Sequence, residues 1–310
     1  MEKYQNILVV IDPTTEDQKA LKRAVELAKC TNARITAYLC IYDFSYEMTT
    51  MLSADERDAM MKSVINDRQL WLSSLIEEID HDGVNIDSTV VWHNRPFEPI
   101  LDQVINNGFD ILIKGTHQHD KLKSVIFTPT DWHLLRKCPC PVLLVKDHLW
   151  PKNGNIVAAV NVGSDEEEHQ LLNNKIVEET QNLAKLIEAN GHLVNSYPGT
   201  PVNIAIEIPE FNANEYNDSM KNHHISAMKE LAEQFDFDIA NTHVEEGLPE
   251  DVIENVAKKL DAELVILGTV GRTGLSAALI GNTAEHVIDR LNCDLLALKP
   301  DNYVSPAAKK

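Results

Sequence analysis

The stretch that decides the fold of this chain is Leu264-Val265-Ile266-Leu267-Gly268-Thr269-Val270-Gly271. Its four consecutive apolar residues are typical of a strand that is buried on both faces of a parallel sheet. Gly268 ends the strand, and a segment rich in small residues leads from Gly271 to Gly281. Residues 284–291 then place apolar side chains at helical spacing, which predicts a helix. A strand that ends in glycines before a helix favours close approach of backbone N–H groups to a phosphate.

The spacing of the glycines is specific: two residues separate Gly268 from Gly271, and nine separate Gly271 from Gly281. This pattern resembles the nucleotide-binding signature of the universal stress protein family, in which the loop holds the ribose and phosphates of ATP. The resemblance implies phosphate contacts from the three glycines and from Asn282 and Thr283. The signature has Ser or Thr directly after the last glycine, so Asn282 departs from it and Thr283 brings the hydroxyl one position later. A plain tight turn is the alternative role of these glycines.

Length and composition limit the classes of protein that fit. A chain of 310 residues favours two domains. The net charge of −20 repels nucleic-acid phosphates and argues against a DNA or RNA partner. No apolar run approaches the ~20 residues of a membrane-spanning helix. The first residues, 1–6, lack the basic and apolar regions of a secretory signal, so we expect a cytoplasmic protein with reduced cysteines.

The sequence repeats one unit of about 150 residues. Gly115 and Gly268 are 153 residues apart, and the same offset joins Cys140 to Cys293. The predicted strands are residues 6–11, 34–42, 86–92, 109–113 and 141–145 in the first unit, and 155–160, 192–197, 264–267 and 295–298 in the second. The predicted long helices are residues 53–79, 166–190, with Gly191 as its C-cap, and 214–235. Strands that alternate with helices predict a parallel α/β sheet in each unit.

Both units resemble universal stress protein domains over nearly the full chain. A degenerate first domain before a motif-bearing second one resembles a tandem-domain subgroup of Gram-negative bacteria. The resemblance implies a five-stranded parallel sheet with helices on both faces of each domain. It also implies that the domains pair through their last strands, within the chain or across a homodimer. We expect domains at residues 1–150 and 151–300 and a disordered tail at 301–310.

The nucleotide motif is broken in the first unit. Gln118 and Thr128 stand where the second unit has its second and third glycines. Pro129 removes one N–H group from the presumed phosphate-binding turn. We therefore expect no ATP binding of the family type in this unit. Asp12 nevertheless occupies the position that, in the family, helps to hold the nucleoside.

The second unit has the glycines but lacks that carboxylate. Asn161 stands at the position of Asp12, and it hydrogen bonds without a charge. We predict a nucleotide site formed by Asn161, the glycine loop and the residues that follow it. Arg272 and Arg290 are nearby cations that could meet phosphate, and an exposed surface position is the alternative for each.

Histidines in the first unit raise the question of a metal. His117 and His119 lie close together after the fourth strand, beside Asp120. Imidazole and carboxylate groups are zinc ligands, but two neighbouring side chains rarely complete a site. We therefore assign no metal site and keep His117 and His119 as zinc candidates.

Three functions are compatible with these features. The first is a stress-response regulatory protein that senses a nucleotide, most simply ATP, with at most slow ATP hydrolysis and no assignable catalytic residue. The second is an adenylating ligase or ATP pyrophosphatase, but residues 12–15 and 161–165 lack the signatures of those enzymes. The third is a tandem scaffold for a protein partner. Another nucleotide-containing ligand, or a mixed polar and apolar one, would also fit the loop. The ligand of the first unit, the partner, the stress signal and the oligomeric state stay open.

Overall fold

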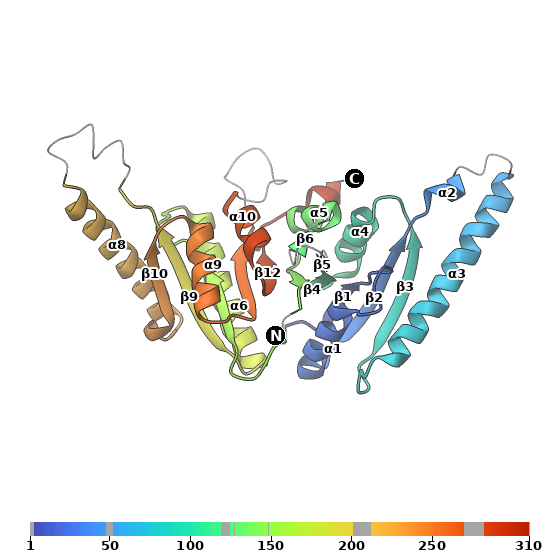
Figure 1. Cartoon of the computed structure of the whole chain (residues 1–310), viewed down its shortest axis with the longest axis horizontal. Coiled ribbons are helices and arrows are strands. Elements are labelled where there is room, and N and C mark those ends of the chain that lie inside the picture. The colour runs from blue at the N-terminus through green and yellow to red at the C-terminus, as the bar shows by residue number, and fades with distance from the viewer. Residues whose placement is uncertain are drawn as a thin grey trace. The chain divides into compact units, whose positions relative to one another are not determined.

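The computed structural model describes residues 3–47, 52–118, 125–126, 128–147, 149–200, 212–269 and 282–309. The chain forms two compact units (Figure 1). Unit 1 consists of Met1–Asp147 with Val304–Lys310, and unit 2 consists of His148–Tyr303. Among the described helices, none is both long and apolar enough to cross a membrane.

Unit 1 is a parallel sheet covered by helices. Its elements in chain order are β1 (Asn6–Val10), α1 (Lys19–Thr31), β2 (Arg34–Ile41), α2 (Phe44–Glu47), α3 (Ala54–Glu78), β3 (Ile86–Trp92), α4 (Phe97–Asn107), β4 (Ile111–Gly115), β5 (His117–Gln118), β6 (Val125–Ile126), α5 (Pro129–Lys137), β7 (Val142–Val145) and the 3-10 helix η2 (Pro306–Lys309). Five strands pair in parallel in the order β7-β4-β1-β2-β3. The short strands β5 and β6 form a separate antiparallel pair.

Unit 2 repeats this plan. Its elements are β8 (Asn155–Ala159), α6 (Glu167–Leu186), β9 (Asn190–Tyr197), α8 (Ala213–Gln234), the 3-10 helix η1 (Ile239–Asn241), β10 (Thr242–Glu246), α9 (Pro249–Lys259), β11 (Leu264–Gly268), α10 (Asn282–Arg290) and β12 (Asp294–Leu298). The strands pair in parallel in the order β10-β9-β8-β11-β12. Two five-stranded parallel sheets with helices on both faces confirm the predicted fold (Figure 1).

The local sequence explains where these elements begin. Ser53 and Glu56 form a capping box at the start of α3: the Glu56 N–H donates to Ser53 Oγ at 3.3 Å, and the Ser53 N–H donates to Glu56 Oε2 at 2.8 Å. The central strands β1 and β11 are buried almost throughout, as continuous apolar runs require in a sheet covered on both faces.

Strand β10 was missed in the sequence. Its residues, Thr242–Glu246, are mostly half-buried because β10 is the last strand of its sheet, covered mainly by α8 on one face. An edge strand of this kind lacks the apolar run that reveals the central strands.

The predicted role of Gly191 is wrong. Helix α6 ends at Leu186, four residues earlier than the helix predicted over residues 166–190, and Glu188 makes the turn with a φ of 54°. Gly191 lies inside β9, where an added Cβ would come 3.0 Å from Thr180 Cγ2. The glycine therefore permits close packing of α6 on the strand, a role that its position in the sequence does not reveal.

The predicted disordered tail is also wrong for residues 301–309. Ser305 is 2% exposed, and its Oγ donates to the Lys137 carbonyl at 2.6 Å. Lys137 is the last residue of α5, so Ser305 satisfies one of the carbonyl groups that a helix end leaves without a partner. Helix η2 packs against α4 of the same unit. The end of the chain thus completes the surface of the N-terminal unit.

Candidate functional site

Each sheet has a point where the chain changes the direction in which it adds strands. In unit 1 the chain moves from β1 outward to β2 and β3 and then crosses to β4 on the other side of β1. Unit 2 makes the same change between β8 and β11. Ligands of such folds bind outside the carboxyl ends of the strands at this point. Each unit therefore has one candidate site, at the ends of β1 and β4 or of β8 and β11.

The unit 1 site holds a cavity of about 340 Å³. Polar residues from the β1–α1 loop and from the ends of β4 and β7 line most of it. The lining residues are Val10, Asp12, Thr14, Thr15, Asp17, Gln18, Lys19, Ala20, Gly115, Thr116 and Asp147. Its volume is at the lower limit of ordinary small-molecule pockets.

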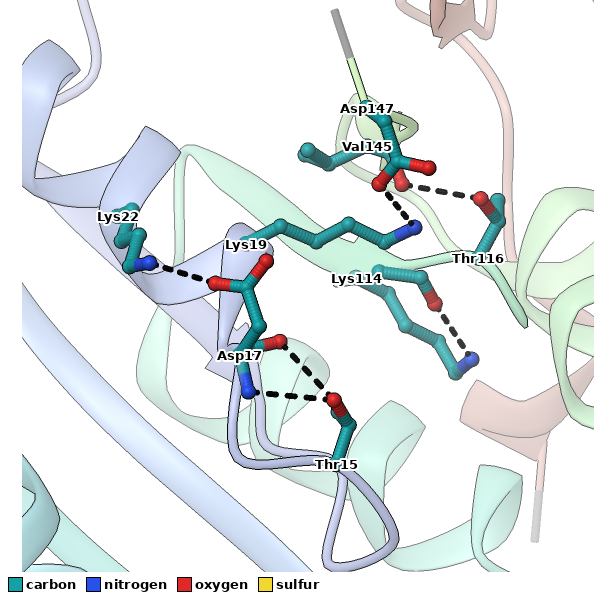
Figure 2. A network of polar contacts seen from close by, with 9 residues as sticks. Thr15, Asp17, Lys19, Lys22, Lys114, Thr116, Val145 and Asp147 are labelled. Carbon is teal, nitrogen blue, oxygen red and sulfur yellow. Dashed lines mark hydrogen bonds and ion pairs between the residues drawn. The ribbon is translucent and has the colours of Figure 1, made fainter. Parts of the chain in front are cut away.

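Carboxylates dominate the charge of this cavity. Asp12 Oδ1 accepts hydrogen bonds from the Thr14 N–H at 2.9 Å and from Thr14 Oγ1 at 2.6 Å. Lys19 Nζ lies 3.2 Å from Asp147 Oδ1, and the Asp17 carboxylate pairs with a lysine of α1 at 2.6 Å (Figure 2). Both lysines thus form ion pairs with carboxylates of the same unit, which leaves less positive charge to attract an anionic ligand.

A buried ion pair lies next to Thr128, which stands at the position of the third glycine of the motif. Lys114 Nζ is 2.7 Å from Asp131 Oδ1, and the two residues are 7% and 0% exposed. Asp131 Oδ2 also accepts from the Thr128 N–H at 2.7 Å, and Thr128 Oγ1 accepts from the Asp131 N–H at 3.3 Å. The N-terminus of α5 is therefore already occupied by the chain's own carboxylate, where the motif would place a phosphate.

The corresponding positions of unit 2 carry no such charges. By the offset of 153 residues, Leu267 replaces Lys114, and Ala284 replaces Asp131. Leu267 and Ala284 are both buried. Leu172 of α6 lies beside Gly268, as Lys19 lies beside Gly115 in unit 1. Sequence reasoning missed the ion pair, although a lysine next to the final glycine of a buried strand and the Thr128-x-x-Asp131 pattern were visible signals.

Gly268 is required by packing in unit 2. A Cβ added to it would lie 2.3 Å from Leu172 Cδ2, which is shorter than any normal contact. A Cβ on Gly115 in unit 1 would instead lie 3.4 Å from Cε of the flexible Lys19 side chain. The same glycine of the repeat therefore has a stricter steric role in unit 2 than in unit 1.

Asn161 lies at the predicted edge, directly after β8, and is exposed. Its N–H donates to Asn173 Oδ1 at 2.9 Å, and its carbonyl accepts from Asn173 Nδ2 at 2.8 Å. In unit 1, Gln18 holds the backbone of Asp12 through the same pair of bonds. A side-chain amide on the following helix thus fixes the backbone at the end of the first strand in both units.

Part of the predicted site lies outside the described residues. Gly271, Arg272 and Gly281 belong to the undescribed range 270–281. The backbone of Asn282 and Thr283 forms the start of α10, directly after that range. The predicted helix therefore begins where the motif requires its free N–H groups.

Arg290 is not placed to meet a phosphate at this helix start. It is the last residue of α10, about 12 Å along the axis from the first. Its guanidinium pairs with Asp251 and lies 3.7 Å from Glu254, both on α9. Arg290 therefore joins α10 to α9 from an exposed position, which is the surface role that the sequence analysis set beside a phosphate contact.

A buried lysine lies beside the start of the motif loop in unit 2. Lys299 Nζ donates to the Thr269 carbonyl at 2.6 Å and lies 5.0 Å from the centre of the Tyr303 ring. Thr269 directly follows Gly268, so this ammonium group places a positive charge below the beginning of the loop.

The zinc candidates receive no support from the described residues. His117 is in β5, and its side chain is not described, while His119 lies in the undescribed range 119–124. Within the described ranges, no group of three or more His, Cys, Asp and Glu side chains is arranged to hold a metal.

Comparison with known proteins identifies relatives of the whole chain. Residues 3–146 and 153–299 each match the profile described as "Universal stress protein family". "Universal stress protein E" of Escherichia coli (strain K12) is 55% identical over 307 residues, covering 99% of this chain and 97% of the relative. The protein of the same name from Photorhabdus laumondii is 52% identical over the full length of both chains.

Solved structures lead to the same fold. A putative universal stress protein from Pseudomonas aeruginosa UCBPP-PA14 is 32% identical, with a TM-score of 0.72, and the alignment covers 97% of this chain and 95% of that one. A functionally unknown protein from Pseudomonas aeruginosa PAO1 is 31% identical, with a TM-score of 0.73 and coverage of 97% and 94%.

Proposed function

The chain belongs to the universal stress protein family in its tandem-domain form, and from this premise we propose that unit 2 binds a nucleotide. ATP is the first candidate. The protein would act by sensing the ligand and presenting a changed surface, and we assign it no catalytic residue. ATP hydrolysis, if present, would be slow.

The loss of carboxylates from the unit 2 edge is the observation that carries this proposal. Two acidic residues of unit 1 have uncharged counterparts in unit 2: Asp12 corresponds to Asn161, and Asp131, with its partner Lys114, is replaced by an apolar pair. Pro300 stands at the position of Asp147, and the carboxylate of the next residue, Asp301, pairs with Lys175. At the same time the buried Lys299 is retained as the counterpart of Lys146. An anionic phosphate chain would therefore meet less repulsion at the unit 2 edge than at the unit 1 edge.

The start of α10 supports the same proposal. Its first residues, Asn282 and Thr283, come directly after the glycine-rich range 270–281 in the sequence, and the first N–H groups of a helix have no partner within it, so they can face a phosphate. In unit 1 the matching turn of α5 is closed by Pro129 and by the Asp131 carboxylate. The proposal thus assigns nucleotide binding to one site per chain.

The test is calorimetric titration of the full-length protein with ATP, using one substitution at the equivalent position of each unit. Gly271→Glu adds a carboxylate to the motif loop of unit 2, and Gln118→Glu adds one at the matching position of unit 1. We expect one ATP per chain in the unchanged protein, no binding by G271E and unchanged binding by Q118E. Equal loss in both variants, or no binding by the unchanged protein, would refute the assignment and favour the scaffold function.

A second pair of variants tests the charge argument directly. Pro300→Asp restores the carboxylate of unit 1 beside Lys299, and Pro300→Asn is a control that is similar in size but uncharged. We expect P300D to bind ATP about tenfold more weakly than P300N, with the difference shrinking as salt is raised. Equal affinities for the two variants would show that charge at this edge does not control binding.

A further inference from the structure

Two buried asparagines hold the backbone of the loop that carries Asn161. One is Asn173, whose two bonds to Asn161 are given above. The other is Asn195 at the carboxyl end of β9, which is 2% exposed and accepts from the Val162 N–H through Oδ1 at 3.1 Å. The backbone of the loop is therefore fixed from α6 and from β9.

The hydrogen bonds of Asn195 determine the protonation state of His224. Because Asn195 Oδ1 faces an N–H group, its Nδ2 is the atom that faces His224 Nδ1, at 3.0 Å. An amide nitrogen donates only, so Nδ1 must accept and the imidazole must be neutral, with its proton on Nε2. His224 comes from α8 and is 5% exposed.

The loop also packs directly on the imidazole. A Cβ added to Gly163 would lie 2.3 Å from His224 Cε1. The loop can therefore lie at its observed position only with glycine at residue 163 and with the ring where it is. Any movement of His224 is transmitted to the residues beside Asn161.

The groups around the ring disfavour its charged form. The Tyr197 ring of β9 stacks on it with centroids 5.5 Å apart, and His223 of α8 meets it edge-on at 5.6 Å. Burial, and then His223, lower the pKa of His224. On the far side of the stacked pair, burial and then Glu246 of β10 and Asp218 of α8 raise the pKa of Tyr197.

The loop itself contributes a second histidine contact. Ser164 Oγ lies 2.6 Å from His169 Nδ1, and Glu166 lies 3.6 Å from that same nitrogen. His169 is therefore a separate titratable group of this loop, and its effect must be separated from that of His224.

We propose that Asn195 and His224 are positioning residues for the nucleotide site of unit 2, and that protonation of His224 releases the loop that carries Asn161. This inference rests on the nucleotide-binding function proposed above. When Nδ1 gains a proton it becomes a donor, and Asn195 must turn its amide to offer Oδ1 to the ring. Asn195 Nδ2 then faces the Val162 N–H, and two donors cannot bond. The Val162 N–H therefore cannot stay bonded to Asn195 while Asn195 also bonds the protonated imidazole of His224.

Unit 1 lacks this device. The Ile11 N–H donates to the Tyr38 carbonyl as the Val160 N–H does to that of Val194, so Leu39 takes the place of Asn195. Leu39 is fully buried and apolar. The proposed pH response is therefore confined to the unit for which we propose nucleotide binding.

The test compares ATP affinity at about pH 5.5 and about pH 7.5 in two variants of His224. One keeps a hydrogen-bond acceptor for Asn195 that cannot be protonated, and the other removes the acceptor. His224→Asn places an amide oxygen near the position of Nδ1 that cannot be protonated, whereas His224→Leu removes the acceptor. We expect the unchanged protein to lose about threefold to tenfold in affinity at the lower pH relative to H224N, in line with one hydrogen bond. H224L should bind more weakly at both pH values. The γ-phosphate is the same in all of these titrations, so its own protonation does not distinguish the variants.

Asn222→Ala, at an exposed position of α8, is the control and should keep the pH dependence. An identical pH response in H224N and in the unchanged protein would overturn the inference while leaving nucleotide binding intact. Nuclear magnetic resonance of ¹⁵N-labelled protein supplies a readout that needs no ligand. We expect His224 in the Nε2–H tautomer and a Val162 amide signal that titrates with it. A Val162 signal that does not follow His224 would also overturn the inference, even if no nucleotide bound.

Discussion

Lys114 and Asp131 form an ion pair, with 2.7 Å between Nζ and Oδ1, at the two positions where the second copy of the repeat has Leu267 and Ala284. Removing one partner of a buried ion pair strongly destabilises a protein, because the other charge is left buried without a counter-charge. The apolar residues Leu267 and Ala284 in unit 2 show that the fold can have either an ion pair or two apolar side chains at these positions.

This relationship predicts a non-additive pair of substitutions. Lys114→Leu alone should lower the free energy of unfolding of unit 1 by about 3 kcal/mol, since Asp131 keeps its charge without a cation. Asp131→Ala alone should cost more, because it also removes the helix cap. The double variant, which copies unit 2, should lose about 2 kcal/mol less than the sum. Denaturant unfolding measures all three, and strict additivity would show that the ion pair contributes nothing.

Gly268 and Gly115 provide a second comparison between the units. Gly268→Ala places a methyl group against Leu172 and should destabilise unit 2 by about 2–3 kcal/mol. Gly115→Ala meets only the flexible Lys19 side chain and should change stability by less than about 1 kcal/mol. Adding Leu172→Ala to G268A should recover part of the loss if the clash is its cause. Thermal unfolding of the four proteins decides this, and equal effects at both glycines would contradict the packing argument.

The paired histidines of β9 and β10 predict acid sensitivity. His192 Nε2 lies 3.2 Å from Asn155 Oδ1, and His192 Nδ1 lies 3.3 Å from His243 Nε2, so the two facing ring nitrogens cannot both carry a proton. Burial is the main cause that lowers the pKa of both His192 and His243. The unfolded chain, with histidine pKa values near ~6.5, then binds more protons than the folded one. Stability is therefore lost as pH falls below about 6.5 and through the lower folded pKa values.

Hydrogen exchange measures this loss locally. Opening free energies of β9 and β10 amides should fall between about pH 7.5 and about pH 5, and His192→Gln should reduce the fall. In unit 1, Arg34 Nε donates to Asn6 Oδ1 at 3.0 Å in place of the histidine. Arginine keeps its charge over this range, so β1 and β2 serve as the internal control. The same pH response in all four strands would contradict the prediction.

The end of the chain predicts a long-range effect on stability. Ser305→Ala removes the bond to the Lys137 carbonyl and should destabilise unit 1, not unit 2, by about 1 kcal/mol. Deleting residues 304–310 should cost more, because η2 also leaves α4. Trp132 of α5 reports unfolding of unit 1 by its fluorescence, and Val304→Ala, at an exposed position, is the control. An unchanged Trp132 transition after the deletion would contradict this role.

The fold was predictable because its signals are local and occur twice. Buried central strands such as β1 and β11 are continuous apolar runs, and the constant offset from Gly115 to Gly268 aligns the two units. Asn161 and the start of α10 were placed by the same reasoning. Edge strand β10 was missed because half-buried residues do not form such a run.

The missed parts of the site depend on contacts between distant residues. Asn195 and His224 are 29 positions apart, and neither differs in sequence from an ordinary strand or helix residue. The role of Gly163 is visible only when α8 is placed against the loop. The partners of Arg290 were not predictable because its position along α10, not its closeness in sequence to the motif, decides what its side chain can reach.

The position of Ser305 has a consequence for how the protein is made. Residues 304–309 leave the ribosome only after the whole of unit 2 has been synthesised. Until then the end of α5 lacks the bond from Ser305, although residues 1–147 of the same unit have already been made. A nascent chain that stops within unit 2 would therefore carry a first unit that is not yet closed at the end of α5.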